Sequence, residues 1–393
     1  MRVLLTSPVF PPDLGGPAVY VPSLGRFLVE RGHEVRVVAF CADPRPAGYP
    51  FEVRAITRGA LPLRYLKAFF AVWKAAREAD VVYVNEHLAL LHVLAGKLAR
   101  KPVMIRIMVD GAWEISHRKG WIDGDDIVTF ETKRYGWKVG LVRALQRRWW
   151  KWSDRIIACS DFLRRIPLEH YGVPEAKLQL IFNAYHGPTL DESIETRASA
   201  RTKLALAQGP RFLLTICRLM VWKNVDGIVR ALRGLPADVE LLVAGDGDML
   251  EPWKRLAREL GLAERVHFLG NVPYAQIPLY IRASDVFVLN SEYEGLSHTL
   301  LEVSALGLPI VCTGVCGNPE VVEDGVNGLL VPSRDDEALR KAIAKLLDDA
   351  PMRERFVRAG LARMGRFSRD DTFGQVEDAL QQLVQRKATP ALR

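Results

Sequence analysis

The chain has 393 residues, of which 49% are apolar and 25% are charged, and this composition indicates a globular protein rather than a disordered one. Because this length exceeds what one compact core usually holds, two domains are expected. The formal net charge of +8 favours an anionic partner: a phosphorylated ligand, a membrane surface or nucleic acid.

The first half of the chain alternates short apolar runs with helical patterns. A helix is expected at residues 18–31, because Leu24, Phe27 and Leu28 recur at helical spacing and Gly32 follows as a stop. This alternation is typical of a mainly parallel sheet that is covered on both faces. Strands are expected at residues 2–7, 34–40, 80–85, 103–109, 155–160 and 178–184.

A polar segment at residues 183–200 separates this series from a second one. The fold class expected is therefore α/β, with two Rossmann-like, doubly wound domains at residues 1–190 and 191–370. A helical pattern at about residues 370–388 follows, and we expect this helix to pack back on the first domain. Strands of the second series are expected at residues 211–219, 239–245, 266–272, 285–290, 309–314 and 328–333.

Ligands of open α/β sheets bind beyond the carboxyl ends of the strands. After the first strand, Gly15 and Gly16 precede a helix, where glycines allow a close backbone approach and the helix N-terminus attracts an anion. The alternative is a plain tight turn. After the strand that ends near Cys217, Arg218 and Lys223 flank a short loop and suit a diphosphate. Solvated loop charge is the alternative there.

The next strand of the second series runs into the sequence VAGDGDMLEP, in which Gly245 and Gly247 form a G-x-G motif. A single G-x-G motif is weak evidence for a nucleotide site. Asp246 and Asp248 resemble a metal-binding pair, but we expect them to cap a helix that begins near Met249.

Glu294 and Glu302 lie eight positions apart in EYEGLSHTLLEVSALGLPIV. Glu294 is expected in the loop after a buried strand, and Glu302 one turn into a helix that begins near Thr299. The amides from Leu296 to Thr299 would then form a helix N-terminus that binds phosphate, with Ser297 or Thr299 as its cap.

A carboxylate beside a bound phosphate is repelled by it, so each glutamate should instead bind neutral hydroxyl groups, as sugars supply. A nucleotide sugar, with a ribose, a diphosphate and a hexose, matches this set. The alternative is that Glu302 only stabilises the helix dipole and that Glu294 is solvated.

At this point the sequence resembles the retaining glycosyltransferases of family four, which have the GT-B fold of two Rossmann-like domains facing across a cleft. The glutamate pair, the Arg218 and Lys223 pair, the Gly15-Gly16 loop and the run GLPIVCTGVCGNPEVVEDGVNGLLVPS carry the resemblance. It covers nearly the whole chain.

The resemblance implies roles for individual residues. Glu302 would bind the nucleoside ribose, Glu294 the hydroxyls of the donor sugar, and Arg218 with Lys223 the diphosphate. Arg218, Lys223, Glu294 and Asp110 are the catalytic candidates. The donor-binding candidates are Gly15, Gly16, Gly245, Asn271, Val272, Gly295, Leu296, Ser297, His298, Thr299 and Glu302.

Three positions depart from the family pattern. Cys217 stands where the family has a glycine before the arginine, and Cys316 replaces the first glycine of a Gly-Gly turn. Asp110 lies where many relatives have a histidine near the sugar, which leaves open that it only caps a loop.

The activity implied is a retaining hexosyltransferase that uses a nucleotide diphosphate sugar and a glycan or lipid-linked acceptor, without a metal or other cofactor. A nucleotide-sugar epimerase of the same fold and a non-catalytic nucleotide-sugar binder remain as alternatives. An NAD-linked oxidoreductase is disfavoured because no strand precedes a complete G-x-G-x-x-G. A sugar nucleotide, rather than nucleic acid, is thus the expected anionic partner.

No targeting signal or membrane-spanning run is identifiable, and the five scattered cysteines favour reduced thiols, so a cytoplasmic protein is expected. The helical segments at residues 61–77 and 137–152 combine cations with aromatic residues. Such helices can lie in an anionic membrane surface, and peripheral attachment is one expectation. The alternative is that the aromatic residues, including Trp137, Trp149, Trp150 and Trp152, pack inward.

Overall fold

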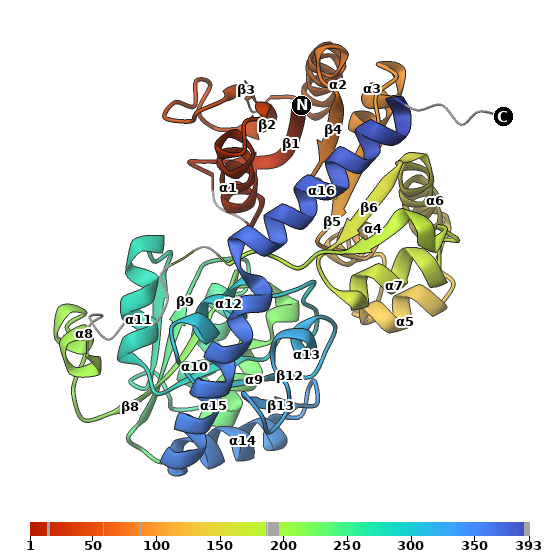
Figure 1. The fold of residues 1–393 in the computed structure, drawn as a ribbon. Helices are drawn as coiled ribbons and strands as arrows, with labels where there is room; N and C mark the ends of the chain where they lie inside the picture. The colour runs from red at the N-terminus through yellow and green to blue at the C-terminus, as the bar shows by residue number, and fades with distance from the viewer. Residues whose placement is uncertain (14–15, 58, 86–88, 186, 188–195, 389–393) are drawn as a thin grey trace. The chain divides into compact units, whose positions relative to one another are not determined.

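A computed structural model describes residues 1–13, 16–57, 59–85, 89–185, 187 and 196–388 (Figure 1). The chain divides into two compact units. The N-terminal unit comprises Met1–Ala184 together with Arg369–Arg393, and the C-terminal unit comprises Tyr185–Ser368. Each unit is built around its own parallel sheet.

The sheet of the N-terminal unit has the strand order β3-β2-β1-β4-β5-β6-β7, and every adjacent pair is parallel. Its central strands are apolar on both faces, so helices must cover both sides. The strands are β1 (Arg2–Phe10), β2 (Glu34–Cys41), β3 (Glu52–Ile56), β4 (Val81–Val84), β5 (Val103–Ile107), β6 (Arg155–Ala158) and β7 (Leu178–Leu180).

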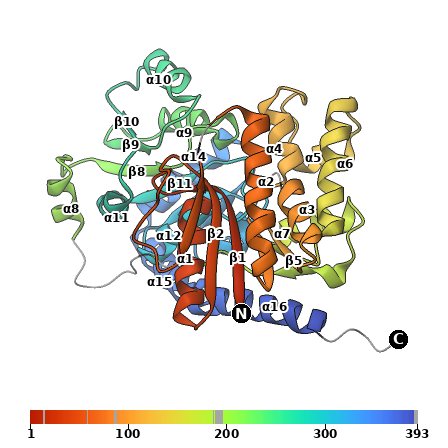
Figure 2. The ribbon, with the colours of Figure 1, turned by 90° about the horizontal axis from the view of Figure 1, so that it is seen from above.

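Helices connect these strands in the doubly wound manner. Figure 2 shows α2, α3 and α6 side by side, and α2 packs on β1, β2 and β3. The helices are α1 (Gly16–Glu30), α2 (Leu61–Glu78), α3 (Leu90–Leu98), α4 (Gly111–Arg118), α5 (Ile127–Thr132), α6 (Trp137–Trp152), α7 (Asp161–Glu169) and the last helix of the chain, α16 (Arg369–Ala388).

Helix α16 belongs to the core of the N-terminal unit although it follows the C-terminal unit in sequence. The ring of Phe373 is wholly buried and makes edge contacts with Tyr20 and Phe27, at centroid distances of 5.5 and 5.6 Å. Val376 and Leu380 join the same cluster. The apolar stripe of the final helix therefore packs on α1 and on one face of the sheet (Figure 1).

The sheet of the C-terminal unit has the order β10-β9-β8-β11-β12-β13, again parallel throughout. This is the order of a dinucleotide-binding Rossmann sheet, in which the direction of winding reverses between β8 and β11. The strands are β8 (Arg211–Ile216), β9 (Val239–Ala244), β10 (Val266–Gly270), β11 (Val286–Leu289), β12 (Ile310–Thr313) and β13 (Leu329–Val331).

The helices of the C-terminal unit bury one apolar stripe each against this sheet. Leu213, Leu241 and Val288 from the strands pack with Ile228 of α9 and Ile343 of α14 in one core. The helices are α8 (Arg197–Lys203), α9 (Val225–Leu232), α10 (Leu250–Glu259), α11 (Ile277–Ala283), α12 (His298–Ala305), α13 (Asn318–Val321), α14 (Asp336–Asp348) and α15 (Ala350–Arg363).

Candidate active site

The carboxyl ends of adjacent strands in the C-terminal unit bring most of the predicted residues to one edge of its sheet. Arg218 and Lys223 follow β8, Gly245 follows β9, and Glu294 follows β11. Asn271 and Val272 follow β10 directly, with Asn271 exposed and Val272 half-buried. Since winding reverses between β8 and β11, their loops diverge around the position where such sheets bind ligands.

The loops after β8 and β9 are held together by backbone contacts that require glycine. Gly245 has φ +137°, and a Cβ there would lie 1.9 Å from the carbonyl oxygen of Cys217. The amide of Leu219 donates to the carbonyl of Asp246 at 2.9 Å. Gly245 therefore acts through this close approach, which fixes the loop that carries Arg218.

The prediction that Asp246 and Asp248 cap the helix after β9 is wrong. Helix α10 begins at Leu250, and its N-cap residue, Met249, makes no side-chain capping bond. Asp246 Oδ1 instead accepts a hydrogen bond from the amide of Gly247 at 2.7 Å. The two aspartates are thus part of the tight turn before the helix.

Lys223 and Glu294 form an ion pair at the centre of this edge. Lys223 Nζ lies 2.6 Å from Glu294 Oε1, and the two side chains are only 16% and 11% exposed. Ser291 Oγ donates to the same oxygen at 2.8 Å. The pairing depends on a short 3-10 turn at Val221–Lys223 and on the left-handed conformation of Asn224 that ends it.

Arg218 differs from Lys223 in its surroundings. Its side chain is exposed and makes no ion pair within the part of the chain that the structure describes. A cation in this state can bind an anion without first giving up another partner. Arg218 and Lys223 thus present one uncompensated and one compensated positive charge on the same strand-end loop.

Glu302 lies in α12 with its side chain turned inward, and the residue is only 8% exposed. Burial raises its pKa to about 7, an effect that the hydroxyl of Tyr274 partly offsets. Its Oε1 has no hydrogen-bond partner among the described residues. A buried carboxylate oxygen without a donor is costly, and a ligand hydroxyl would satisfy it.

The structure decides which of the two predicted residues caps the N-terminus of α12. Ser297 is the cap, because its Oγ accepts from the amide of Leu300 at 3.2 Å. Leu296 and Ser297 are nearly buried, whereas His298 and Thr299 are half-buried. This end of the helix therefore presents its first amides beside Glu294 and Gly295.

The turn at Cys316 and Gly317 closes against the same loop. The amide of Gly317 donates to the carbonyl of Glu294 at 3.0 Å, and a Cβ at Gly317 would lie 2.0 Å from the carbonyl oxygen of Gly295. Cys316 adopts φ +51°, a left-handed conformation that glycine reaches at lower cost. Cys316 thus holds a left-handed conformation at the position where the resemblance implies glycine.

The sequence did not predict two further side chains at this edge of the sheet. Ser291 accompanies Glu294, and Tyr274 approaches Glu302. Ser291 comes directly after the strand-ending asparagine, Asn290, so its position was a usable signal. Tyr274 carried none, because its relation to Glu302 depends on how the loop after β10 turns.

The candidates of the N-terminal unit are less uniform. Gly15 lies outside the described residues, and Gly16 is the exposed first residue of α1. Asp110 has no exposed surface and is the N-cap of α4, where it accepts from the amide of Trp113 and from Gln146 Nε2, both at 2.7 Å. Burial raises its pKa to about 6.

The capping alternative for Asp110 is observed, and it caps a helix rather than a loop. Its two oxygens link α4 and α6 through Trp113 and Gln146. A catalytic role for Asp110 stays a prediction.

No group of three or more His, Cys, Asp or Glu side chains that could hold a metal ion occurs among the described residues. The candidate site is instead a set of two cations, two carboxylates and a helix N-terminus at one sheet edge. Such a set can bind a phosphate group and neutral hydroxyl groups at once.

Comparison with known proteins assigns this architecture to the glycosyltransferases with the GT-B fold. Residues 196–363 match the family described as Glycosyl transferases group 1, and residues 14–186 match Glycosyltransferase Family 4. Between them the two matches span most of the chain. The protein belongs to the group 1 glycosyltransferases of this family and is a glycosyltransferase enzyme.

Its similarity to individual proteins extends over nearly the full length. It is 28% identical to a GDP-mannose-dependent alpha-(1-6)-phosphatidylinositol monomannoside mannosyltransferase of Mycobacterium tuberculosis, over 92% of each chain. It is 26% identical to a D-inositol 3-phosphate glycosyltransferase of Xylanimonas cellulosilytica, over 97% of this chain and 96% of that one. The structure of HepE from Anabaena, in complex with UDP and glucose, aligns with a TM-score of 0.79 at 21% identity, covering 97% of this chain and 100% of HepE.

Proposed function

We propose that this protein is a retaining glycosyltransferase that moves a hexosyl group from a nucleotide diphosphate sugar to a glycan or lipid-linked acceptor. The observation that carries the proposal is the gathering of Arg218, Lys223, Glu294 and Glu302 at one edge of the C-terminal sheet. This edge of the sheet combines cations, which bind phosphate, with carboxylates, which bind hydroxyl groups. A nucleotide sugar carries both phosphate and hydroxyl groups.

Each part of the donor has a matching group at this edge. The unpartnered Oε1 of Glu302 suits a ribose hydroxyl, and Glu294, beside Ser291, suits hydroxyls of the transferred sugar. Arg218 and Lys223, with the first amides of α12, suit the diphosphate. The backbone at Asn271 and Val272, at the end of β10, is then left for the base.

In the reaction proposed, the bond between the sugar's anomeric carbon and the β-phosphate oxygen breaks. The acceptor oxygen forms its new bond on the same face of the sugar, and the departing phosphate takes the acceptor's proton. Negative charge grows on the diphosphate as it leaves, so preorganised cations lower the barrier. Lys223 and Arg218 supply this charge, and neither a metal ion nor another cofactor is required.

The relatives support the same class of chemistry. The mycobacterial protein is named for mannosyl transfer to a phosphatidylinositol mannoside, the Xylanimonas protein for glycosyl transfer to an inositol phosphate, and HepE was crystallised with UDP and glucose. A role in polysaccharide or glycolipid synthesis follows from these names as a proposal. An epimerase of the same fold, or a non-catalytic nucleotide-sugar binder, would need no acceptor.

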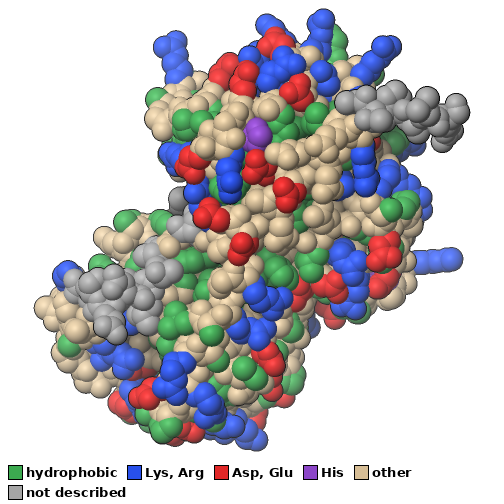
Figure 3. All heavy atoms as spheres, viewed as in Figure 1, with side chains coloured by type: hydrophobic (Ala, Val, Ile, Leu, Met, Phe, Trp, Pro, Cys, Tyr) green, Lys and Arg blue, Asp and Glu red, His purple; other side chains and the backbone are tan. Residues whose placement is uncertain are grey.

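We further propose that the N-terminal unit attaches peripherally to an anionic membrane. On α2, Leu63, Leu66 and Phe70 lie on one face and are 53%, 51% and 54% exposed. Lys67 and Lys74 are exposed beside them. Figure 3 shows Lys and Arg side chains together with acidic and hydrophobic ones over the region that α2 occupies in Figure 1.

Helix α6 presents a second exposed row, in which Trp137, Leu141 and Leu145 are 75%, 51% and 37% exposed. Of the four tryptophans, Trp149 and Trp150 are buried in the core, whereas Trp137 and Trp152 are exposed. No helix in the described part of the chain is long and apolar enough to cross a bilayer. Attachment would therefore rest on the surfaces of α2 and α6.

The test of the transfer reaction has two stages. A panel of nucleotide sugars is first screened for an increase in the thermal midpoint of the protein, since a ligand that binds the folded state stabilises it. The stabilising donor is then incubated with candidate acceptors, and the anomeric configuration of the product is read by proton NMR. Donor inversion at a ring carbon without transfer would instead identify an epimerase, and binding without turnover a non-catalytic binder.

A further inference from the structure

A basic cavity lies in the N-terminal unit, apart from the candidate active site. Its volume is about 480 Å³, within the range of ligand-binding sites. It opens at the amino-terminal edge of the sheet, where β5 and β6 begin, whereas α/β sheets place their catalytic groups at the carboxyl ends. Its lining residues are Lys97, Arg100, Lys101, Pro102, Asp154, Leu383, Arg386 and Lys387.

Segments distant in sequence supply these cations. Lys97 lies in the last turn of α3, and Arg100 and Lys101 lie in the short connection to β5. Arg386 and Lys387 lie in the last turn of α16. The packing of α16 on this unit therefore assembles the cavity, which neither segment could form alone.

Asp154 is the only carboxylate among the described residues that line the cavity, and it is already engaged. Asp154 Oδ1 lies 2.6 Å from Lys97 Nζ, and its Oδ2 accepts from the amide of Val103 at 2.7 Å. The remaining cations, Arg100, Lys101, Arg386 and Lys387, make no ion pair with any residue that the structure describes. Four of the lining cations thus have no ion-pair partner in the described part of the chain.

The electrostatic consequence is visible in Lys387. Burial lowers the pKa of Lys387; the charge of Asp154 opposes this effect, and the like charges of Lys97 and Lys101 add to it. Arg100 adds a conformational cost, because it has φ +58° at a position just after α3 where glycine would be unstrained. An anion bound between these side chains would offset both the repulsion between the cations and the backbone strain at Arg100.

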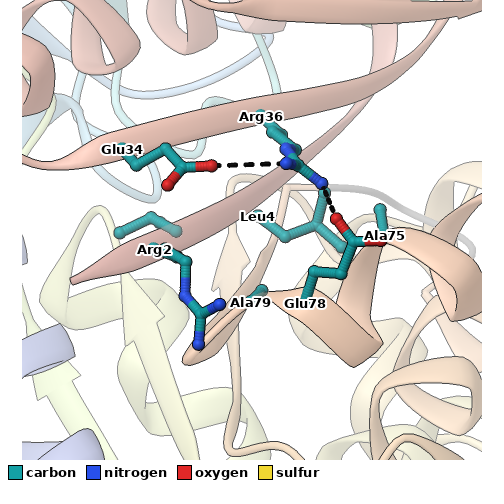
Figure 4. A pocket seen from close by; sticks show the side chains of 8 residues that line it. Arg2, Leu4, Glu34, Arg36, Ala75, Glu78 and Ala79 are labelled. Atoms are coloured by element: carbon teal, nitrogen blue, oxygen red, sulfur yellow. Dashed lines mark hydrogen bonds and ion pairs between the residues drawn. The ribbon is translucent and has the colours of Figure 1, made fainter.

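Another charged hollow at the same edge shows a different arrangement. The space between Arg2, Arg36, Glu34 and Glu78 measures only about 10 Å³ (Figure 4). Arg36 pairs with Glu34 at 3.3 Å and also with Glu78, so its charge is compensated within the protein. Unpaired cations around an open volume are therefore not a general property of this edge.

We propose that the cavity binds a phosphate-bearing anion through Arg100, Lys101, Arg386 and Lys387. Guanidinium groups bind phosphate oxygens in pairs, and ammonium groups add point charges. The phosphate can come from a soluble phosphorylated metabolite or from a lipid headgroup. This site is independent of the proposed donor site, which lies in the other unit.

The test compares the wild type with the cavity variant Lys101→Gln/Arg386→Gln. Pyrophosphate binding is measured by calorimetry in an Arg218→Gln/Lys223→Ala background, which removes both cations of the proposed donor site. Vesicles of phosphatidylcholine with and without phosphatidic acid form the second arm. The matched control, Lys119→Gln/Arg134→Gln, removes two exposed charges of the same unit outside the cavity.

We expect the cavity variant to bind pyrophosphate or phosphatidic acid vesicles about tenfold or more weakly, and the control to bind as the wild type does. Loss in the calorimetric arm alone identifies a soluble ligand, and loss in the vesicle arm supports a lipid headgroup. Removing mutually repelling cations should also leave the thermal midpoint unchanged or raise it.

If this variant fails to fold, Lys387→Gln replaces it. Equal binding by wild type and cavity variant, or no binding by the wild type in either arm, would overturn the proposal.

Discussion

Lys223 Nζ lies 2.6 Å from Glu294 Oε1, so the cation predicted to hold a phosphate is paired with the acid predicted to hold a sugar. Both side chains are largely buried, and Ser291 shares the acid's oxygen. Removing one member of such a pair leaves an uncompensated buried charge, which is strongly destabilising. The two residues are therefore coupled, and a substitution at either one changes the electrostatics of the other.

Replacing Lys223 with alanine should reduce the turnover number by a factor of about 10² to 10³, because one preorganised charge is lost from the leaving group. Binding of the nucleoside diphosphate should weaken as well. Turnover and calorimetric titration measure the two effects. Lys254→Ala is the matched control, since Lys254 pairs at 2.9 Å with Glu251 in α10. Unchanged turnover in Lys223→Ala would remove Lys223 from the proposed site.

The two glutamates should have separable functions. Glu302→Gln should weaken binding of the bare nucleoside diphosphate, which contains the ribose, because an amide accepts hydroxyl hydrogen bonds less strongly than a carboxylate. Glu294→Gln should not weaken that binding and should impair binding or transfer of the sugar. Calorimetric titration of both variants with nucleoside diphosphate and with nucleotide sugar measures the difference.

Equal losses of diphosphate affinity in the two variants would contradict this division. The ion pair described above does not produce such a result, although Glu294→Gln also frees Lys223. A freed Lys223 should strengthen diphosphate binding, however, and not weaken it. The sign of the change in Glu294→Gln thus separates loss of the ion pair from loss of a ribose contact.

Glu302 should also give binding and stability a pH dependence. Burial raises its pKa from 4.5 to about 7, so the folded chain retains a proton in this window that the unfolded chain releases. Its contribution to stability is therefore lost as the pH rises from 4.5 through about 7. Donor binding should strengthen over the same window, because ionised Glu302 accepts ribose hydroxyls. Both slopes should be reduced in Glu302→Gln, when thermal midpoints and diphosphate affinities are compared with the wild type across this range.

Much of the candidate site at the carboxyl edge of the C-terminal sheet was predictable, because the loops that follow its strands carry distinctive residues. The positions of Arg218, Lys223 and Glu294 follow from where the strands end, and the buried strands are recognisable by their apolar runs. The ion pair between Lys223 and Glu294 was not predictable, because it depends on the 3-10 turn and the left-handed Asn224. Repulsion between phosphate and carboxylate suggested separate ligands for these two residues and gave no reason to pair them.

Other differences arise where a local pattern has two outcomes. Strand β3 (Glu52–Ile56) was missed, since it is a half-exposed edge strand whose charged residues alternate with apolar ones. Helical spacing groups the tryptophans of α6 but does not say which face meets the sheet, so the burial of Trp149 and the exposure of Trp137 required the structure. Asp110 was likewise ambiguous, because capping and catalysis both favour an aspartate after a strand.

Gly245 provides a test of how the loops are held. Gly245→Ala would bring a Cβ to 1.9 Å from the carbonyl oxygen of Cys217 at φ +137°, and should cost about 3 kcal/mol of stability and weaken nucleotide binding. Gly261→Ala is the control, because Gly261 has φ +70° but nothing within 4 Å of its Cβ position, and should cost about 1 kcal/mol. Thermal unfolding and calorimetry distinguish them. Similar losses in both variants would show that the conformation, and not the contact with Cys217, sets the cost.

Membrane attachment should divide into a salt-sensitive and a salt-resistant part. The exposed cations Lys67 and Lys74 of α2 each contribute about 1 kcal/mol near an anionic surface, so Lys67→Gln/Lys74→Gln should weaken binding roughly thirtyfold at low salt. That difference should shrink at high salt, as screening increases.

Leu66→Gln/Trp137→Gln should remove the part that salt does not release, because these exposed side chains insert into the interface. Val326→Gln, at a residue of the C-terminal unit that is 40% exposed, is the control. Sedimentation with neutral and anionic vesicles at two salt concentrations measures each part. No sedimentation of the wild type with anionic vesicles at low salt would leave the exposed rows of α2 and α6 without a membrane role.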